Sequence, residues 1–91
     1  MEYQVVVLPS AEADLESLPV EVREAIIGRL EWLRVNAEVV IHRRLHNLPD
    51  DLAGLCRLRH GDYRVLYWRY PADRTLKVYR IQHRSEVYRD L

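Results

Sequence analysis

The spacing of apolar residues divides the chain into an N-terminal part with helical periodicity and a C-terminal part with strand-like alternation. Tyr3 to Leu8 is largely β-branched and apolar and stops at Pro9, which predicts a first strand. Ser10 is a candidate N-cap for the segment that follows. Apolar residues then recur at helical spacings of four and three: Ala11, Leu15 and Leu18. This pattern predicts a short helix that ends before Pro19.

A second helix is predicted to begin at Pro19, a residue that suits a first helical turn. Four apolar residues form one stripe on an otherwise charged segment: Val22, Ile26, Leu30 and Leu33. The stripe fades near Asn36, so the two helices are expected to form a helical hairpin.

The residues from Val39 to Asp51 lack a clear period and contain the turn signal Pro49-Asp50-Asp51, so this segment is expected to be a connection. After it the apolar period becomes two, which predicts three further strands: Leu55 to Arg59, Tyr63 to Tyr70 and Leu76 to Ile81. The predicted order is therefore β-α-α-β-β-β. We expect a single α+β domain over residues 1–91, with the helical hairpin packed on a small, mainly antiparallel sheet.

A two-residue turn at His60-Gly61 separates the side chains of the predicted sheet into two faces. In this register Arg57 lies opposite Arg64, and Arg59 lies opposite Asp62. The helix-facing side receives Cys56, Leu58, Tyr63, Val65 and Tyr67. The other side receives three arginines, Arg57, Arg59 and Arg64.

A four-residue loop from Pro71 to Arg74 sets the register of the last strand. It places Tyr67 opposite Val78 and Leu66 opposite Tyr79. The same register turns Arg80 toward the helices and His83 toward the arginine face.

Composition narrows the class of protein. Hydrophobic residues make up 48% and charged residues 31% of the chain, which is typical of a folded globular domain. The single cysteine, Cys56, permits no intrachain disulfide, and no window has the roughly 18 apolar residues of a membrane span. We therefore expect a cytoplasmic protein with no membrane partner.

The net charge of zero conceals an asymmetry that changes the expected partners. Residues 1–41 hold eight acidic and three basic residues, whereas residues 42–91 hold six acidic and eleven basic residues. A basic C-terminal half is compatible with an anionic partner such as RNA.

Three arginines with a nearby histidine fit the chemistry of RNA cleavage. Arginine binds phosphate oxygens through its planar fork, and histidine gives or takes a proton near neutral pH. The alternative interpretation is that these arginines are ordinary solvated surface charges. For Arg59 the two interpretations are equally good. For Arg57 and Arg64 phosphate binding is favoured, because like charges paired across strands repel. For His83 the residues alone favour a surface role. His42, His46 and His60 are expected to be surface residues, and no metal or cofactor is expected.

Several segments resemble the RelE-like toxins of prokaryotic toxin-antitoxin systems. The resemblance rests on Leu45-His46-Asn47-Leu48, on the run from Gly54 to Tyr67, on the segment from His83 to Tyr88 and on the segment from Leu18 to Arg23. It covers nearly the whole chain. Two positions depart from the family pattern: Leu55 stands where a strand lysine is usual, and Gln82 where an arginine is usual.

The resemblance implies a toxin that is held inactive by a cognate, RelB-like or other small antitoxin. Once free, such a toxin enters the ribosomal A site and cuts messenger RNA as an endoribonuclease. Matching positions assign Arg64 to the scissile phosphate, Arg57 to a basic strand position, His83 to acid or base chemistry and Tyr88 to catalysis. We further expect Arg43, Arg44, Arg59 and Arg84 to contact RNA.

Two other functions stay open at this point. A ParE-like protein that poisons DNA gyrase would share the fold and needs no acid-base residues. A catalytically inactive relative that only binds an antitoxin would also share it. His83 together with Arg57, Arg64 and Tyr88 favours the ribonuclease.

Overall fold

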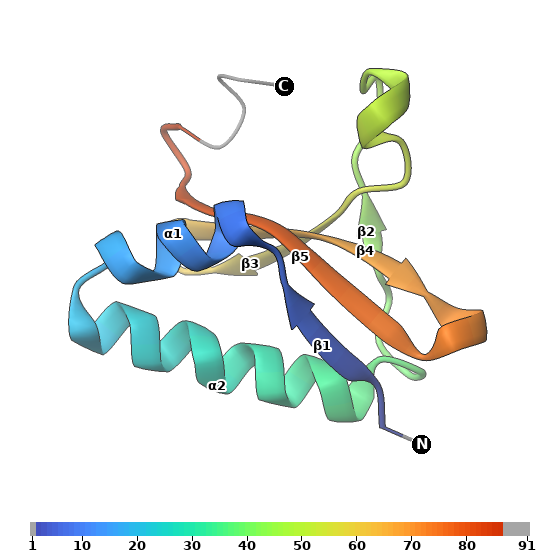
Figure 1. Cartoon of the computed structure of the whole chain (residues 1–91), viewed down its shortest axis with the longest axis horizontal. Coiled ribbons are helices and arrows are strands. Elements are labelled where there is room, and N and C mark those ends of the chain that lie inside the picture. Colours follow the sequence, from blue (N-terminus) through green and yellow to red (C-terminus); the bar gives the residue numbers. More distant parts are fainter. Residues whose placement is uncertain (1, 87–91) are drawn as a thin grey trace.

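A computed structural model describes residues 2–86, in which two helices pack against a five-stranded sheet (Figure 1). The helices are Pro9–Ser17 (α1) and Val20–Asn36 (α2), the strands are Gln4–Val7 (β1), Arg43–Arg44 (β2), Cys56–His60 (β3), Tyr63–Tyr70 (β4) and Thr75–His83 (β5), and 3-10 turns cover Asp50–Leu52 and Pro71–Asp73. The strand order is β1-β5-β4-β3-β2, and only β1 with β5 is parallel. The predicted α+β fold is confirmed, with β2 as an addition. No helix in the described part of the chain is long and apolar enough to cross a membrane.

The helices follow the apolar stripes closely. Ile26, Leu30 and Leu33 of α2 are buried, and they pack under the sheet together with Ala11 of α1. Pro9 occupies the first turn of α1, so Ser10 lies inside the helix and the prediction that it caps the helix is wrong. Proline has no backbone N–H to leave unsatisfied in a first turn, which explains why the helix begins there.

The helix-facing side of the sheet carries the main core. Its buried strand residues are Cys56, Val65, Tyr67, Leu76, Val78 and Ile81, and Tyr3, just before β1, is buried with them. Those of β3 and β4 alternate with residues of the opposite face, as the period of two requires. The predicted assignment of Cys56, Val65 and Tyr67 to this face is confirmed.

A second apolar cluster covers part of the opposite face. Leu52, Leu55 and Leu66 are buried there, and Leu45, Leu48, Trp68 and Tyr79 pack against them. The indole Nε1 of Trp68 donates a hydrogen bond to the Ala53 carbonyl at 3.0 Å. The connection between α2 and β3 is thus a structured cover, and full burial of Leu55 explains why no lysine stands at this position.

The hairpin of β3 and β4 turns one step later than predicted. Arg59 pairs with Arg64 and His60 with Tyr63, so the loop is Gly61-Asp62. Gly61 has a φ of 56°, a value that glycine adopts without steric cost. Each β3 residue therefore pairs with a β4 residue two positions later than predicted, and a shift of two leaves every side chain on its predicted face. The cross-strand partner of Arg57 is consequently Leu66 and not Arg64.

A bulge between β4 and β5 changes which face the last residues of β5 occupy, which the shift in the β3–β4 hairpin does not. Tyr67 pairs with Val78 as predicted, but Leu66 pairs with Arg80, which leaves Tyr79 as the extra residue. An extra residue inverts the alternation beyond it. The bulge pairs Arg80 with Leu66 of the opposite face, although the Arg80 side chain still reaches Asp14 of α1. The prediction that His83 faces the arginines is wrong, because His83 pairs with Tyr63.

Helix α1 seals the edge of β5 where β1 has ended. The Ser10 hydroxyl donates to the Tyr79 carbonyl at 2.6 Å, and the Asp14 carboxylate accepts from the Ile81 N–H at 2.8 Å. Arg80 reaches the same carboxylate with its Nε at 2.9 Å. Side chains of α1 therefore replace the missing strand neighbour along this part of β5.

Candidate phosphate-binding face

One face of the sheet gathers arginines from three strands. Arg57 and Arg59 of β3 and Arg64 of β4 share the side that faces away from the helices, as predicted. Arg43 of β2 pairs directly with Arg57 and joins them. We call Arg43, Arg57, Arg59 and Arg64 the arginine face.

Two of these residues are direct cross-strand partners. Arg59 and Arg64 lie opposite one another on β3 and β4, a like-charge arrangement that destabilises a sheet unless an anion compensates it. Within residues 2–86 neither guanidinium makes an ion pair. The nearby Asp62, which the predicted register placed opposite Arg59, instead faces Arg84, with 3.7 Å between Oδ1 and Nε.

Arg64 lies on the central strand of the sheet. Its Nη1 donates to the carbonyls of Gly61 at 2.9 Å and Tyr63 at 3.0 Å, so the hairpin turn holds one edge of the guanidinium. In the part of the chain that the structure describes, its other nitrogens donate to no protein group. A guanidinium held at one edge keeps its remaining donors available for a phosphate.

The arginine face continues around the free edge of β3 into a hollow. Arg43, Arg57 and Arg59 line it together with Arg29 of α2. Arg29 stacks on Trp32, with its Cζ 4.5 Å from the ring centroid. Arg29 is not among the residues predicted from the sequence, because on a charged helix face nothing distinguishes it from an ordinary solvated residue.

His83 lies on the other side of the sheet from Arg64. It pairs with Tyr63, and the two rings meet edge to face with centroids 5.5 Å apart, whereas Gln82 is the partner of Arg64. The Ser85 N–H donates to Nδ1 of His83 at 3.2 Å. Because Nδ1 accepts, the neutral ring carries its proton on Nε2, which makes no hydrogen bond to a protein group in residues 2–86.

The remaining predicted residues are dispersed. Arg44 pairs with Cys56 and so lies on the helix-facing side, away from Arg43. Arg84 follows the end of β5 and is exposed. Tyr88 lies outside the described residues. Among the described residues, no three His, Cys, Asp or Glu side chains gather where they could hold a metal ion.

His42 is not a surface residue. Its Nε2 contacts the Ala37 carbonyl at 2.7 Å and its Nδ1 contacts the Tyr67 hydroxyl at 2.6 Å. Since a carbonyl only accepts, Nε2 carries the proton and Tyr67 donates to Nδ1. His42 therefore has a structural role, joining the end of α2 to β4.

Comparison with known proteins gives one consistent family. Residues 5–88 match the family described as the ParE toxin of the type II toxin-antitoxin system parDE. Toxin RelE of Mycobacterium tuberculosis is 32% identical over 87 residues, covering 96% of this chain and 87% of that protein. Toxin RelG of the same organism is 34% identical over 95 residues, covering 98% and 99%.

Solved structures agree with the sequence matches. The toxin-antitoxin complex RelBE2 of Mycobacterium tuberculosis contains a chain with a TM-score of 0.77 and 28% identity, covering 93% of this chain and 94% of that one. The archaeal RelE-RelB complex of Pyrococcus horikoshii gives a TM-score of 0.72 and 25% identity, with coverage of 96% and 100%. The chain therefore belongs to the RelE/ParE superfamily and is a RelE-like toxin of a type II toxin-antitoxin system.

Proposed function

We propose that this toxin is a ribosome-dependent endoribonuclease that cuts messenger RNA and so inhibits translation. The observation that carries the proposal is the pair of Arg59 and Arg64 on one sheet face, without a carboxylate partner in residues 2–86. Two adjacent cations without a protein counter-ion match the needs of a bound phosphodiester. The ribosome as a partner follows from the resemblance to RelE-like toxins, and a cytoplasmic location belongs to the same proposal.

The proposed reaction is attack of a ribose 2′-oxygen on the adjacent phosphorus. The O2′–P bond forms and the P–O5′ bond breaks, while a base takes the 2′-hydroxyl proton and an acid protonates the leaving 5′-oxygen. Arg64 binds the scissile phosphate and stabilises the charge that develops on it, with Arg57 as a second cation. His83 and Tyr88 are the proposed proton-transfer residues.

RNA contacts are proposed along the same face. Arg43 and Arg59 are exposed and flank Arg57 and Arg64, so they suit the phosphates next to the cleaved one. Arg84 lies beyond the end of β5 and suits a contact at the rim.

The proposed inhibitor is a RelB-type antitoxin. The solved relatives include toxin-antitoxin complexes of this kind from Mycobacterium tuberculosis and Pyrococcus horikoshii. The excess of basic residues in residues 42–91 favours an antitoxin segment that is acidic or amphipathic.

A second candidate function is poisoning of DNA gyrase. The observation that favours it is the match of residues 5–88 to the family described as the ParE toxin. A gyrase poison needs a binding surface but no proton-transfer residues, so the arginine face would serve only as an interface.

Primer extension on a translated message after induction separates these functions. The ribonuclease account predicts growth arrest with new 5′ ends inside codons of translated messages, and none on an untranslated copy of the same message. Arrest with broken DNA, an SOS response and intact messages would establish the gyrase function. Normal growth in cells that accumulate folded toxin would show an inactive relative.

A further inference from the structure

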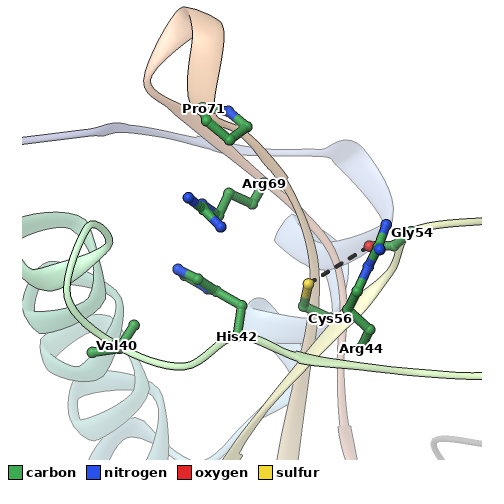
Figure 2. Close-up of a pocket in the computed structure, with 7 residues that line it drawn as sticks. All are labelled: Val40, His42, Arg44, Gly54, Cys56, Arg69 and Pro71. Atoms are coloured by element: carbon green, nitrogen blue, oxygen red, sulfur yellow. Dashed lines mark hydrogen bonds between the residues drawn. The ribbon is translucent and has the colours of Figure 1, made fainter.

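A second cluster of positive charge lies on the helix-facing side of the sheet. A hollow of about 370 Å³ opens where the loop after α2, strand β2 and the hairpin of β4 and β5 come together. Figure 2 shows Arg69 and Arg44 on the two sides of Cys56, with the ring of His42 next to Arg69. Because Arg44 faces away from Arg43, this hollow is separate from the arginine face.

The positive charge in this hollow has no protein counter-ion in the described structure. Neither Arg44 nor Arg69 makes an ion pair within residues 2–86, and no carboxylate lines the hollow. Arg69 is half-buried, and its Nε is fully buried without a hydrogen-bond partner. Nη1 of Arg74, on the adjacent turn, is also buried without a hydrogen-bond partner. A guanidinium removed from water is costly unless an anion accompanies it.

The other polar groups of the hollow do not supply the missing negative charge. Both ring nitrogens of His42 are engaged by Ala37 and Tyr67. Burial raises the pKa of the Cys56 thiol, and the neighbouring Arg44 and Arg69 only partly oppose this effect. The cysteine is therefore a neutral thiol at pH 7, and the charge of the two arginines remains uncompensated.

We propose that this hollow binds a phosphate group between Arg44 and Arg69. The two arginines come from different strands, β2 and β4, and line the hollow on opposite sides of Cys56. A carboxylate has two oxygens, which one guanidinium fork already satisfies, whereas a phosphate has further oxygens for a second guanidinium. The phosphate comes either from an RNA strand or from free phosphate in solution. Binding here does not depend on the proposed cleavage activity.

The test is a titration of the full-length, 15N-labelled toxin, followed by NMR at constant ionic strength. Inorganic phosphate and a 5′-phosphorylated RNA trinucleotide are the probes, and the backbone amides of Gly54 and Cys56 report on the hollow. We expect saturable shifts at both amides. Arg69→Met should weaken binding by at least about tenfold, since a charge-assisted hydrogen bond is lost. Lys77→Met removes one exposed charge outside the hollow and should bind like the wild type.

Several outcomes would overturn the site. One is an equal shift with chloride alone, and another is unchanged phosphate affinity in both Arg69→Met and Arg44→Met. Arg44 is exposed, so its variant keeps the test valid should Arg69→Met fail to fold. Saturable shifts with a glutamate-rich peptide but not with phosphate would replace the phosphate by an acidic protein partner. Tighter binding of the trinucleotide than of phosphate assigns the site to RNA, and equal affinities assign it to free phosphate.

Discussion

His83 and His60 occupy matched positions on the two sides of Tyr63. Both are cross-strand partners of Tyr63, His60 from β3 and His83 from β5, and both are half-buried. Only His83 has a ring nitrogen fixed by a backbone N–H, which leaves Nε2–H as a defined proton donor at the rim of the sheet. The two histidines therefore form a natural pair of test and control.

We expect His83→Ala to slow single-turnover cleavage by about 10²–10⁴, because that is the usual contribution of a positioned acid or base. Added imidazole should restore part of the rate, since it can occupy the vacated space. His60→Ala should cleave at the wild-type rate. Equal rates for His83→Ala and wild type would show that His83 transfers no proton in the reaction.

The candidate site shows which residue-level features the sequence predicts. Alternation correctly placed Arg57, Arg59 and Arg64 on one face, because a register error of two residues leaves faces unchanged. It failed for His83, because one extra residue at Tyr79 inverts the alternation and no local sequence signal marks that bulge.

At the scale of elements, the predicted helices and long strands are correct because each buries a periodic apolar stripe. The pair Arg43–Arg44 was missed as a strand because two residues carry no period, and their pairing with β3 is a tertiary contact. The sealing of β5 by Ser10 and Asp14 was missed for the same reason. Nothing in the local sequence indicates that these α1 side chains bond to a strand more than 60 residues away.

The contact between α1 and β5 predicts a large effect of Asp14→Ala on stability. The Asp14 side chain is only 15% exposed, and its loss leaves the Ile81 N–H without an acceptor and breaks the ion pair with Arg80. We expect the free energy of unfolding to fall by about 2–3 kcal/mol. Denaturant unfolding measures this value.

Glu31→Ala is the matched control for Asp14→Ala. It also breaks a carboxylate–arginine pair, with Arg34, but this pair lies on the surface. Its loss should cost at most about 0.5 kcal/mol. Equal effects of the two substitutions would contradict the sealing role of Asp14.

At the scale of the whole molecule, the charge asymmetry bears on inhibition. The basic residues of the C-terminal half lie on both sides of the sheet, with the arginine face on one side and Arg44 and Arg69 on the other. The acidic residues of the N-terminal half lie mainly on the helices. An antitoxin that neutralises the toxin by charge must therefore reach the sheet and cannot act from the helices alone.

We expect a RelB-type antitoxin encoded next to the toxin gene to co-purify with it and to slow amide hydrogen exchange in β3, β4 and β5. Mass spectrometry of the complex and of the free toxin measures this footprint. Protection confined to α1 and α2 would contradict neutralisation of the basic half.

The most direct test of the account is single-turnover cleavage of messenger RNA on programmed ribosomes by purified wild type and Arg64→Ala. Arg64 makes no ion pair in residues 2–86 and bonds only to carbonyls of its own turn, so we expect the free energy of unfolding to change by only about 0.5 kcal/mol. Cleavage should fall by about 10²–10³, the usual cost of losing one donor to developing charge. A folded Arg64→Ala protein that cleaves at the wild-type rate would show that the arginine face is not the active site.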